Sequence, residues 1–483
     1  MSGLKEACGI AGVILRKSES PNESSYLAYL SLHALQHRGQ ESAGIISFKG
    51  DSSSSIVRNM GLVGQIFDQN KLDSLKGHLS LGHVRYSTTG ESEICNAQPI
   101  VLQSKIFKTI ALAHNGNLVN SSALKKELTS KGTELFTTSD SELLIHLLDN
   151  SIDSDTEDVV LSALKDSLSK AKGAFSLGIS LGGKYLIGVK DPNGLRPLCL
   201  GAIKDDDVIS GYIIASESCA LDIVGAEFIR ELSPGEVILI NEDLEIKSTF
   251  LSNREQKLCL FEMVYFMRPD SEIRDVQISS YREELGKRLA INSPPPSNAD
   301  IVIGVPDSGT PAAIGFATQS GLPFTNGLVK NRYIGRTFIQ PSQSTRQLGI
   351  KIKLNPLPKI IKNKSVVLID DSVVRGNTPR QLVKLLKQAG AKEVHMRISS
   401  PPIAWGCYYG IAMKDNELIA RRMKLDIEEI RKELGADSLA YLNLEDLLDI
   451  TNSDPASFCT ACFNGNYPAG ISDEENQERL ALT

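Results

Sequence analysis

A cysteine close to the start of the chain, Cys8, is the first residue whose type suits covalent chemistry. A cysteine thiol has an ordinary pKa of about 8.5 and needs a base, and an α-amino group with a pKa of about 7.7–8.0 on the same residue provides one if the preceding chain is removed. Taken alone, a cysteine beside Gly9 is more often a buried core residue. The other motifs of the chain must decide between these two interpretations.

A second stretch, residues 366–379, has the composition of an anion-binding loop between a strand and a helix. Its apolar run ends in Asp370 and Asp371, and a short polar loop leads to Thr378, which is predicted to cap the helix, and to Pro379 at its first position. Exposed amides at a helix start suit a phosphate, and paired acids suit sugar hydroxyls or Mg²⁺. The alternative is an ordinary strand and helix whose acids face solvent.

The chain that must position these residues has 483 residues, of which 41% are hydrophobic and 23% charged, with a formal net charge of −6. This composition is that of a globular protein, and at about 150 residues per domain the length predicts two large domains or three ordinary ones. A negative charge without a long basic run argues against nucleic acid or a membrane as partner. Because Met1–Ala7 lacks the apolar segment of a secretory signal, the predicted compartment is the cytoplasm.

The first half of the chain has the pattern of an α+β fold. Short apolar runs separated by Gly, Asn and Ser predict antiparallel strands, and two longer stretches predict helices at Glu23–His37 and Ser141–Leu148. The strands are predicted at Ile10–Leu15, Ala43–Phe48, Leu79–Arg85, Thr109–Ala113, Phe175–Ser180, Tyr185–Val189 and Tyr212–Ala215.

The second half alternates strands with helices, which predicts parallel strands in an α/β sheet with ligands at their carboxyl ends. The change of pattern places a boundary near residues 250–260. The elements are predicted at Asp300–Val305, Pro311–Gln319, Ser365–Ile369, Pro379–Ala389 and Val394–Ile398.

Four motifs of the first half, taken together and in this order, resemble the glutaminase domain of the amidotransferases with an N-terminal nucleophile. They are Cys8–Gly12, Gly82–Thr88, His114–Asn117 and Thr138–Glu142. The resemblance implies an αββα sandwich, removal of a propeptide of residues 1–7, and attack of the Cys8 thiolate on the side-chain amide of glutamine.

The same resemblance implies a role for each remaining motif. The Asn115 side chain and the Gly116 backbone N–H would stabilise the oxyanion. Arg85 would hold the carboxylate of glutamine through its planar fork, and Asp140 the α-ammonium group. Without the family, Arg85 and Asp140 could equally form a structural ion pair, or Asp140 could cap the helix that follows it.

The second half resembles the type I phosphoribosyltransferases, whose signature is an apolar strand, two acids and a small-residue loop before a helix. In that family the acids contact the ribose hydroxyls of phosphoribosyl pyrophosphate and the loop grips its 5-phosphate. The residues implied to bind this substrate are Asp370, Asp371, Ser372, Arg375, Gly376, Asn377 and Thr378.

Two further segments match the same family. Gly304–Gly309 is similar to its pyrophosphate loop, which implies Mg²⁺, one per subunit, at Ser308, Asp370 and Asp371. The segment Lys330–Phe338 carries three cations, Lys330, Arg332 and Arg336, and suits a lid over a polyanion. Taken without the family, it could be a solvated basic loop.

A glutaminase followed by a phosphoribosyltransferase resembles the family of glutamine phosphoribosylpyrophosphate amidotransferases. The resemblance implies transfer of ammonia from L-glutamine to phosphoribosyl pyrophosphate, giving 5-phosphoribosylamine, glutamate and pyrophosphate, the first step of de novo purine biosynthesis. It also implies a homotetramer inhibited by purine nucleotides. The alternatives are a regulator that senses phosphoribosyl pyrophosphate and binds DNA, and an amidotransferase that aminates a sugar phosphate.

The remaining cysteines gain a meaning from this family, some members of which hold a 4Fe–4S cluster with four distant cysteines. Cys259, Cys407, Cys459 and Cys462 lie in matching contexts, which implies one cluster per subunit. By itself the C-x-x-C pair at the end of the chain could be half a zinc site, a redox pair or chance. The predicted domains are a propeptide (1–7), a glutaminase domain (8–250), a phosphoribosyltransferase domain (251–450) and a tail with cluster ligands (451–483).

Overall fold

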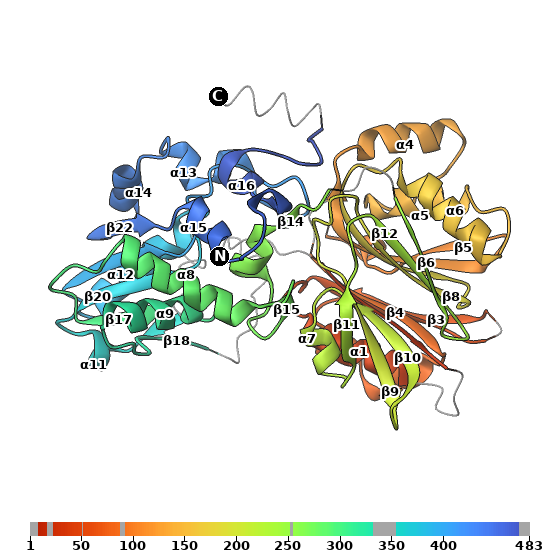
Figure 1. The fold of residues 1–483 in the computed structure, drawn as a ribbon, viewed down its shortest axis with the longest axis horizontal. Helices are drawn as coiled ribbons and strands as arrows, with labels where there is room; N and C mark the ends of the chain where they lie inside the picture. The colour runs from red at the N-terminus through yellow and green to blue at the C-terminus, as the bar shows by residue number, and fades with distance from the viewer. Residues whose placement is uncertain are drawn as a thin grey trace.

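A computed structural model of the chain describes residues 8–16, 23–50, 52–86, 92–251, 255–331 and 354–472. The chain forms two halves that lie side by side, the first on the right and the second on the left in Figure 1. Within the described residues, no helix is long and apolar enough to cross a membrane.

The first half is built on two antiparallel sheets that pack face to face. Their strand orders are β11-β9-β10-β1-β4-β2-β3 and β13-β12-β8-β7-β6-β5. Ile14 and Leu81 of the first sheet pack against Leu186 and Ile238 of the second. The strands are β1 (Gly9–Leu15), β2 (Ser42–Phe48), β3 (Ser54–Met60), β4 (Leu79–Arg85), β5 (Ile100–Ser104), β6 (Lys108–Leu118), β7 (Gly173–Leu181), β8 (Tyr185–Lys190), β9 (Cys199–Asp205), β10 (Val208–Ala215), β11 (Glu227–Glu231), β12 (Glu236–Asn241) and β13 (Ile246–Phe250).

Helices cover the outer faces of both sheets. Leu32 of α1 (Glu23–Ala34) packs on the first sheet, and Leu144 of α5 (Ser141–Asp149) packs on the second. This layering is the predicted αββα sandwich, which is therefore confirmed. The other helices of this half are α2 (Val63–Ile66), α3 (Gln69–Ser74), α4 (Ser121–Ser130), α6 (Glu157–Leu168) and α7 (Cys219–Asp222).

The second half is built on a parallel sheet in the order β17-β20-β21-β22. The helices α8 (Ile278–Asn292) and α9 (Thr310–Ser320) pack on one face of the sheet, and α12 (Asn377–Gln388) and α14 (Ile427–Leu434) on the other. The predicted α/β fold is therefore confirmed. The strands are β17 (Ile301–Gly304), β20 (Ser365–Asp370), β21 (Glu393–Ile398) and β22 (Ser438–Tyr441).

Shorter elements complete the second half. In one two-stranded parallel sheet, Cys259 pairs with Cys459, so that residues 458–459 lie beside the segment that follows the first half. The predicted division near residues 250–260 and the other domain limits stay predictions. These elements are β14 (Leu258–Cys259), β15 (Glu272–Ile273), β16 (Val276–Gln277), β18 (Leu328–Lys330), β19 (Leu354–Pro356), β23 (Phe458–Cys459), α11 (Pro358–Ile361), α13 (Ile419–Arg422), α15 (Leu444–Asp449), α16 (Ala461–Asn464) and a π-helix (Glu262–Phe266).

Two predicted helix boundaries are wrong. The helix predicted to reach His37 ends at Ala34, because the next residues form a turn in which the Arg38 N–H donates to the Leu35 carbonyl. Thr378 and Pro379 lie inside α12, which begins at Asn377. Gly376 turns the chain there with φ +79°, a left-handed conformation that glycine adopts without strain.

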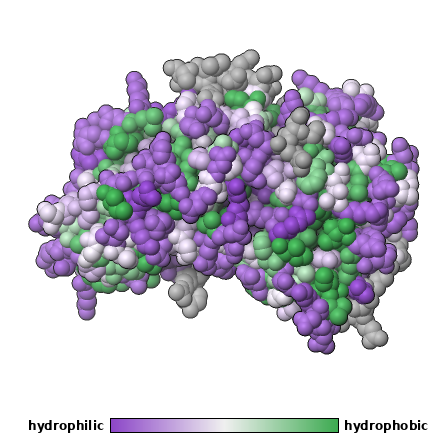
Figure 2. Space-filling view, viewed as in Figure 1, coloured by the Kyte–Doolittle hydropathy of each residue, from purple (hydrophilic) through white to green (hydrophobic). Residues whose placement is uncertain are grey.

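Large apolar side chains are exposed on and near the edge strand β11. Figure 2 shows hydrophobic residues gathered over the lower part of the first half, where Figure 1 places β9 to β11. The exposed side chains of this region include Val208, Ile223, Phe228 and Ile229. Exposed apolar surface of this kind is typical of protein–protein contacts.

The close packing of α8 on α9 depends on two facing glycines. A Cβ at Gly315 would lie 1.9 Å from the Glu283 carbonyl oxygen, and one at Gly286 would lie 1.9 Å from the Ala312 carbonyl oxygen. We therefore expect Gly315→Ala to force the helices apart and to destabilise the fold by about 1–3 kcal/mol. Thermal unfolding measures the loss against Thr318→Ala, an exposed change on the same helix, and equal midpoints for both variants would contradict this packing.

Candidate active sites

Cys8 lies just before β1 and is 7% exposed. Its thiol donates a weak hydrogen bond to the Tyr86 carbonyl oxygen over 3.6 Å. Burial raises the pKa of the thiol above its ordinary value. A base close to Cys8 is therefore needed before this sulfur can act as a nucleophile at neutral pH.

The predicted oxyanion residues lie on β6, between β5 and β7 in the second sheet of the first half. The Asn115 side chain is fully buried, and neither its oxygen nor its nitrogen has a hydrogen-bond partner among the described atoms. Gly116 has φ +149°, and a Cβ there would lie 2.0 Å from the Ala174 carbonyl oxygen. A buried amide without a hydrogen-bond partner lowers the stability of the fold. The Asn115 side chain is therefore suited to donate to a bound ligand.

The two residues predicted to hold the ends of glutamine are buried at nearby strand ends. Arg85, at the end of β4, donates to the Glu41 carboxylate over 2.5 Å. Asp140 accepts the Leu118 N–H at the end of β6 over 2.9 Å. Asp140 occupies the N-cap position of α5, as the alternative predicts, but its side chain makes no capping hydrogen bond. Arg85 thus forms a buried ion pair with Glu41, Asp140 is held against the end of β6, and the roles of both residues toward glutamine stay predictions.

The acidic pair of the second half lies at the carboxyl end of β20. Asp370 and Asp371 are 7% and 4% exposed, so the alternative that they face solvent is wrong. Burial raises the pKa of both carboxyls, and the charge of Asp371 raises that of Asp370 further. The hydroxyl groups of Ser308 and Ser372 donate to Asp371. Because Ser308 belongs to the predicted pyrophosphate loop, this loop contacts the acidic pair.

The cations predicted to bind phosphate lie in different places. Arg375 is turned toward Glu417, with 2.9 Å between its Nε and the carboxylate. Lys330 forms an ion pair with Asp307 in the predicted pyrophosphate loop. Arg332 and Arg336 lie outside the described residues. Of the predicted lid, Lys330 is thus the cation that the structure brings to the site.

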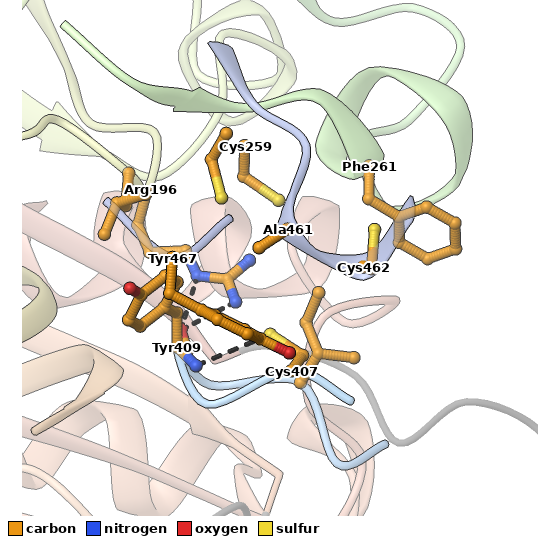
Figure 3. Close-up of a pocket in the computed structure, with 11 residues that line it drawn as sticks. Arg196, Cys259, Phe261, Cys407, Tyr409, Ala461, Cys462 and Tyr467 are labelled. Atoms are coloured by element: carbon orange, nitrogen blue, oxygen red, sulfur yellow. Dashed lines mark hydrogen bonds between the residues drawn. The ribbon is translucent and has the colours of Figure 1, made fainter. Parts of the chain in front are cut away.

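The four cysteines predicted to hold a cluster line one pocket (Figure 3). They come from three places in the chain, which are Cys259, Cys407 and the C-x-x-C pair Cys459 and Cys462. Burial raises the pKa of Cys259 to about 11 and raises those of Cys459 and Cys462 as well. Among the residues that the structure describes, no three His, Cys, Asp or Glu side chains are arranged around a single ion.

The two candidate sites are joined by direct contacts between the halves. The Asn117 side chain donates to the Tyr408 carbonyl oxygen over 3.0 Å. A Cβ at Gly410 would lie 3.0 Å from the Gly116 backbone, so the loop of the second half rests against the predicted oxyanion residue. Burial raises the pKa of Tyr86, and the charge of Arg375 in the second half works to lower it. The carbonyl oxygen of Tyr86 accepts the hydrogen bond from the Cys8 thiol.

Sequence reasoning missed the buried charges that surround these sites. Arg38, Arg196, Glu217 and Glu262 are each 1% exposed or less and are bonded to one another across the two halves. A single arginine or glutamate in a sequence carries no signal of burial, and these partners lie far apart along the chain.

Comparison with known proteins agrees with this geometry. A family described as "Glutamine amidotransferase domain" matches residues 83–222, and one described as "Phosphoribosyl transferase domain" matches residues 288–399. The amidophosphoribosyltransferase of Synechococcus elongatus is 47% identical over 99% of this chain and 94% of its own length. That of Bacillus subtilis is 43% identical over 98% of this chain and 96% of its own length.

A solved structure gives the same result. The glutamine phosphoribosylpyrophosphate amidotransferase of Bacillus subtilis, in complex with ADP and GMP, is 42% identical, covers 97% of this chain and 98% of its own, and superposes with a TM-score of 0.87. These relatives confirm the enzyme class predicted from the sequence and leave the two alternative functions without support. The chain belongs to the amidophosphoribosyltransferase family.

Proposed function

We propose that the chain transfers ammonia from L-glutamine to phosphoribosyl pyrophosphate, forming 5-phosphoribosylamine, glutamate and pyrophosphate at the start of purine biosynthesis. The observation that carries the proposal is that one chain holds a buried thiol, Cys8, and the buried, unpartnered amide of Asn115 in its first half, and a buried acidic pair at the end of β20 in its second half. Family membership supports the reaction, and the residue roles below are proposals.

The first half-reaction takes place at Cys8. Its α-amino group, freed by removal of residues 1–7, takes the thiol proton, and the sulfur attacks the amide carbon of glutamine. The Asn115 nitrogen and the Gly116 N–H donate to the oxyanion, while Arg85 and Asp140 hold the two charged ends of the substrate. The α-ammonium group returns this proton to the amide nitrogen, which leaves as ammonia, and water then hydrolyses the thioester to release glutamate.

The second half-reaction takes place at the acidic pair. Asp370 and Asp371 accept hydrogen bonds from the ribose hydroxyls, and the loop from Ser372 to Thr378 with Lys330, Arg332 and Arg336 holds the phosphates. Ammonia attacks C1 of the sugar and displaces pyrophosphate with inversion. When bound, Mg²⁺ neutralises the charge of the leaving pyrophosphate.

The residues at the acidic pair fit one Mg²⁺ per subunit. Two carboxylates whose pKa values are raised by burial gain from a nearby cation, and the Ser308 hydroxyl is already bonded to Asp371. Mg²⁺ in nucleotide and phosphate sites commonly takes one or two protein carboxylates together with substrate oxygens and water. Ser308, Asp370 and Asp371 would therefore hold it.

Ammonia passes between the sites inside the protein, because ammonium formed in bulk water has no lone pair for the attack. Two contacts support this route. Asn117 and Gly116 lie directly against the loop of the second half that contains Tyr408 and Gly410.

The four-cysteine pocket fits one 4Fe–4S cluster per subunit. Its donor set is four thiols, which is the set that such clusters take. Cys259, Cys407, Cys459 and Cys462 would hold the cluster, which would join the end of the chain to both halves.

Three further properties are proposed from the family and the surface. Purine nucleotides act as feedback inhibitors, a proposal supported by the ADP and GMP in the Bacillus subtilis relative. The subunits form a homotetramer, supported by the exposed apolar side chains near β11. The enzyme works in the cytoplasm.

The division of labour is tested at the nucleophile. We expect Cys8→Ala to lose glutamine-dependent synthesis and to keep ammonia-dependent synthesis, because only the first half-reaction uses the thiol. Pyrophosphate release with each nitrogen source measures both activities, and Cys95→Ala is the matched control. Loss of both activities in folded Cys8→Ala protein would contradict the assignment, and intact mass of the active parent checks that residues 1–7 are absent.

The acidic pair is tested through activity and stability together. We expect Asp370→Asn to lower synthesis with either nitrogen donor by at least about 100-fold, since a preorganised charge is removed. Because the pKa of Asp370 is raised in the folded state, its ionised form costs stability above that pKa, and metal-free Asp370→Asn should melt at a higher temperature than the parent at neutral pH.

This gain should shrink as the pH falls through the raised pKa of Asp370, because the parent carboxyl then also becomes neutral. Thermal scans at several pH values measure the gain, with Asp449→Asn, an exposed acid of α15, as control. A lower melting temperature for Asp370→Asn at neutral pH would count against the strained acidic pair.

The cluster is tested by composition. Protein prepared without oxygen should contain about four iron and four sulfide per chain. Replacing one ligand, Cys459→Ser, should abolish the iron content or the yield of folded protein, whereas Cys95→Ser should leave both unchanged. One zinc and no iron per chain in the anaerobic parent would show a four-thiolate zinc site instead.

A further inference from the structure

A buried chain of charges runs from the nucleophile to the four-cysteine pocket. Glu262, in the π-helix, accepts from Arg38 over 2.8 Å and from Arg196 over 2.9 Å. Arg38 also donates to Glu217 over 2.5 Å, and all four side chains are fully buried. None of the roles proposed above involves these four charged residues.

One end of the chain of charges rests on the nucleophile itself. The Arg38 Nε donates to the Cys8 carbonyl oxygen over 2.9 Å. Once residues 1–7 are removed, Cys8 has no covalent neighbour on its amino side. Its backbone is then held by the strand pairing that begins at Gly9 and by this bond from Arg38.

The other end forms a wall of the four-cysteine pocket (Figure 3). The Nε and Nη2 of Arg196 donate to the Tyr409 carbonyl oxygen over 3.0 and 2.7 Å. The Tyr409 N–H in turn lies 3.4 Å from the Cys407 sulfur. A continuous set of hydrogen bonds therefore joins a pocket cysteine to the backbone of Cys8.

We propose that Arg196 and Glu262 are positioning residues that hold Arg38 on the Cys8 carbonyl and so tie the geometry of the nucleophile to the four-cysteine pocket. The inference rests on the proposed role of Cys8. It also gives the pocket a structural role. Arg196, on the pocket side, and Arg38, on the Cys8 side, both donate to the Glu262 carboxylate, and so the pocket supports the glutaminase site.

The planar fork of arginine is what this role requires. The Arg196 guanidinium donates to the Tyr409 carbonyl and to Glu262 at the same time, in directions fixed by its plane. A lysine keeps the charge but has a single nitrogen, which cannot keep both bonds in the same geometry. Arg196→Lys should therefore release Glu262 and let Arg38 shift on Cys8.

The test uses anaerobically prepared, mature enzyme. We expect Arg196→Lys to lower the rate of Cys8 alkylation by iodoacetamide, followed by mass of the Cys8 peptide, and the glutaminase kcat by about tenfold each, equivalent to about 1.4 kcal/mol in the barrier. The KM for glutamine and ammonia-dependent synthesis should stay unchanged.

The matched control is Arg397→Lys, another buried arginine, which donates to the carbonyls of Ser293 and Pro294 in the second half. It should leave the alkylation rate of Cys8 unchanged. Unchanged alkylation and kcat in folded Arg196→Lys would overturn the proposal. So would equal losses of both synthetic activities, since a general loss of folded protein reduces both.

A double-mutant cycle separates the chain of charges from independent effects. In an Arg38→Lys background, Arg196→Lys should slow alkylation of Cys8 no further, because both changes act through the same bond. Additive effects would overturn the proposal. If Arg196→Lys does not fold, Glu262→Asp takes its place with the same expected results. Full glutamine-dependent synthesis by Cys8→Ala would instead refute the nucleophile assignment, whatever these variants show.

Discussion

The carboxylate of Glu262, held between two guanidinium groups at the contact of the two halves, is the interaction on which the seating of one half against the other depends. Its partners, Arg38 and Arg196, come from the turn after α1 and from the segment between β8 and β9. Breaking a buried ion pair by removing one partner costs about 3–5 kcal/mol, because the remaining charge stays buried. Sliding one half over the other would therefore separate charges that have no access to water.

The charges of this network balance, which is why the interior tolerates it. Arg38 and Arg196 face Glu262 and Glu217, and Glu217 is further bonded to His37 over 2.7 Å. Burial works to raise the pKa of Glu217, but the charges of His37 and Arg38 outweigh it and lower that pKa. The stabilisation is therefore present at neutral pH and is lost as the pH falls through the lowered pKa.

The fold class could be predicted from the sequence, because central strands such as β1 and β20 are buried on both faces and are visible as apolar runs. Sequence reasoning missed the edge strands β3, β11 and β13, which are largely exposed and carry no such run, and it also missed β5, β9 and β12, of which β12 is a fully buried apolar run. It also missed the pairing of Arg38 with Glu262, because the two residues are 224 positions apart and the pattern around each is ordinary.

The fully hydrogen-bonded network around Glu262 and the incompletely bonded groups of the two candidate sites are related. Asn115 has two buried polar atoms without partners among the described residues, and Asp370 and Asp371 are neighbouring buried carboxyls with raised pKa values. Such groups cost stability until a ligand completes them, and they persist only where the surroundings hold them in place. Because the bonds of Glu262 resist displacement of one half against the other, the fold can keep both sites incomplete, and the binding energy of each substrate goes into completing its site.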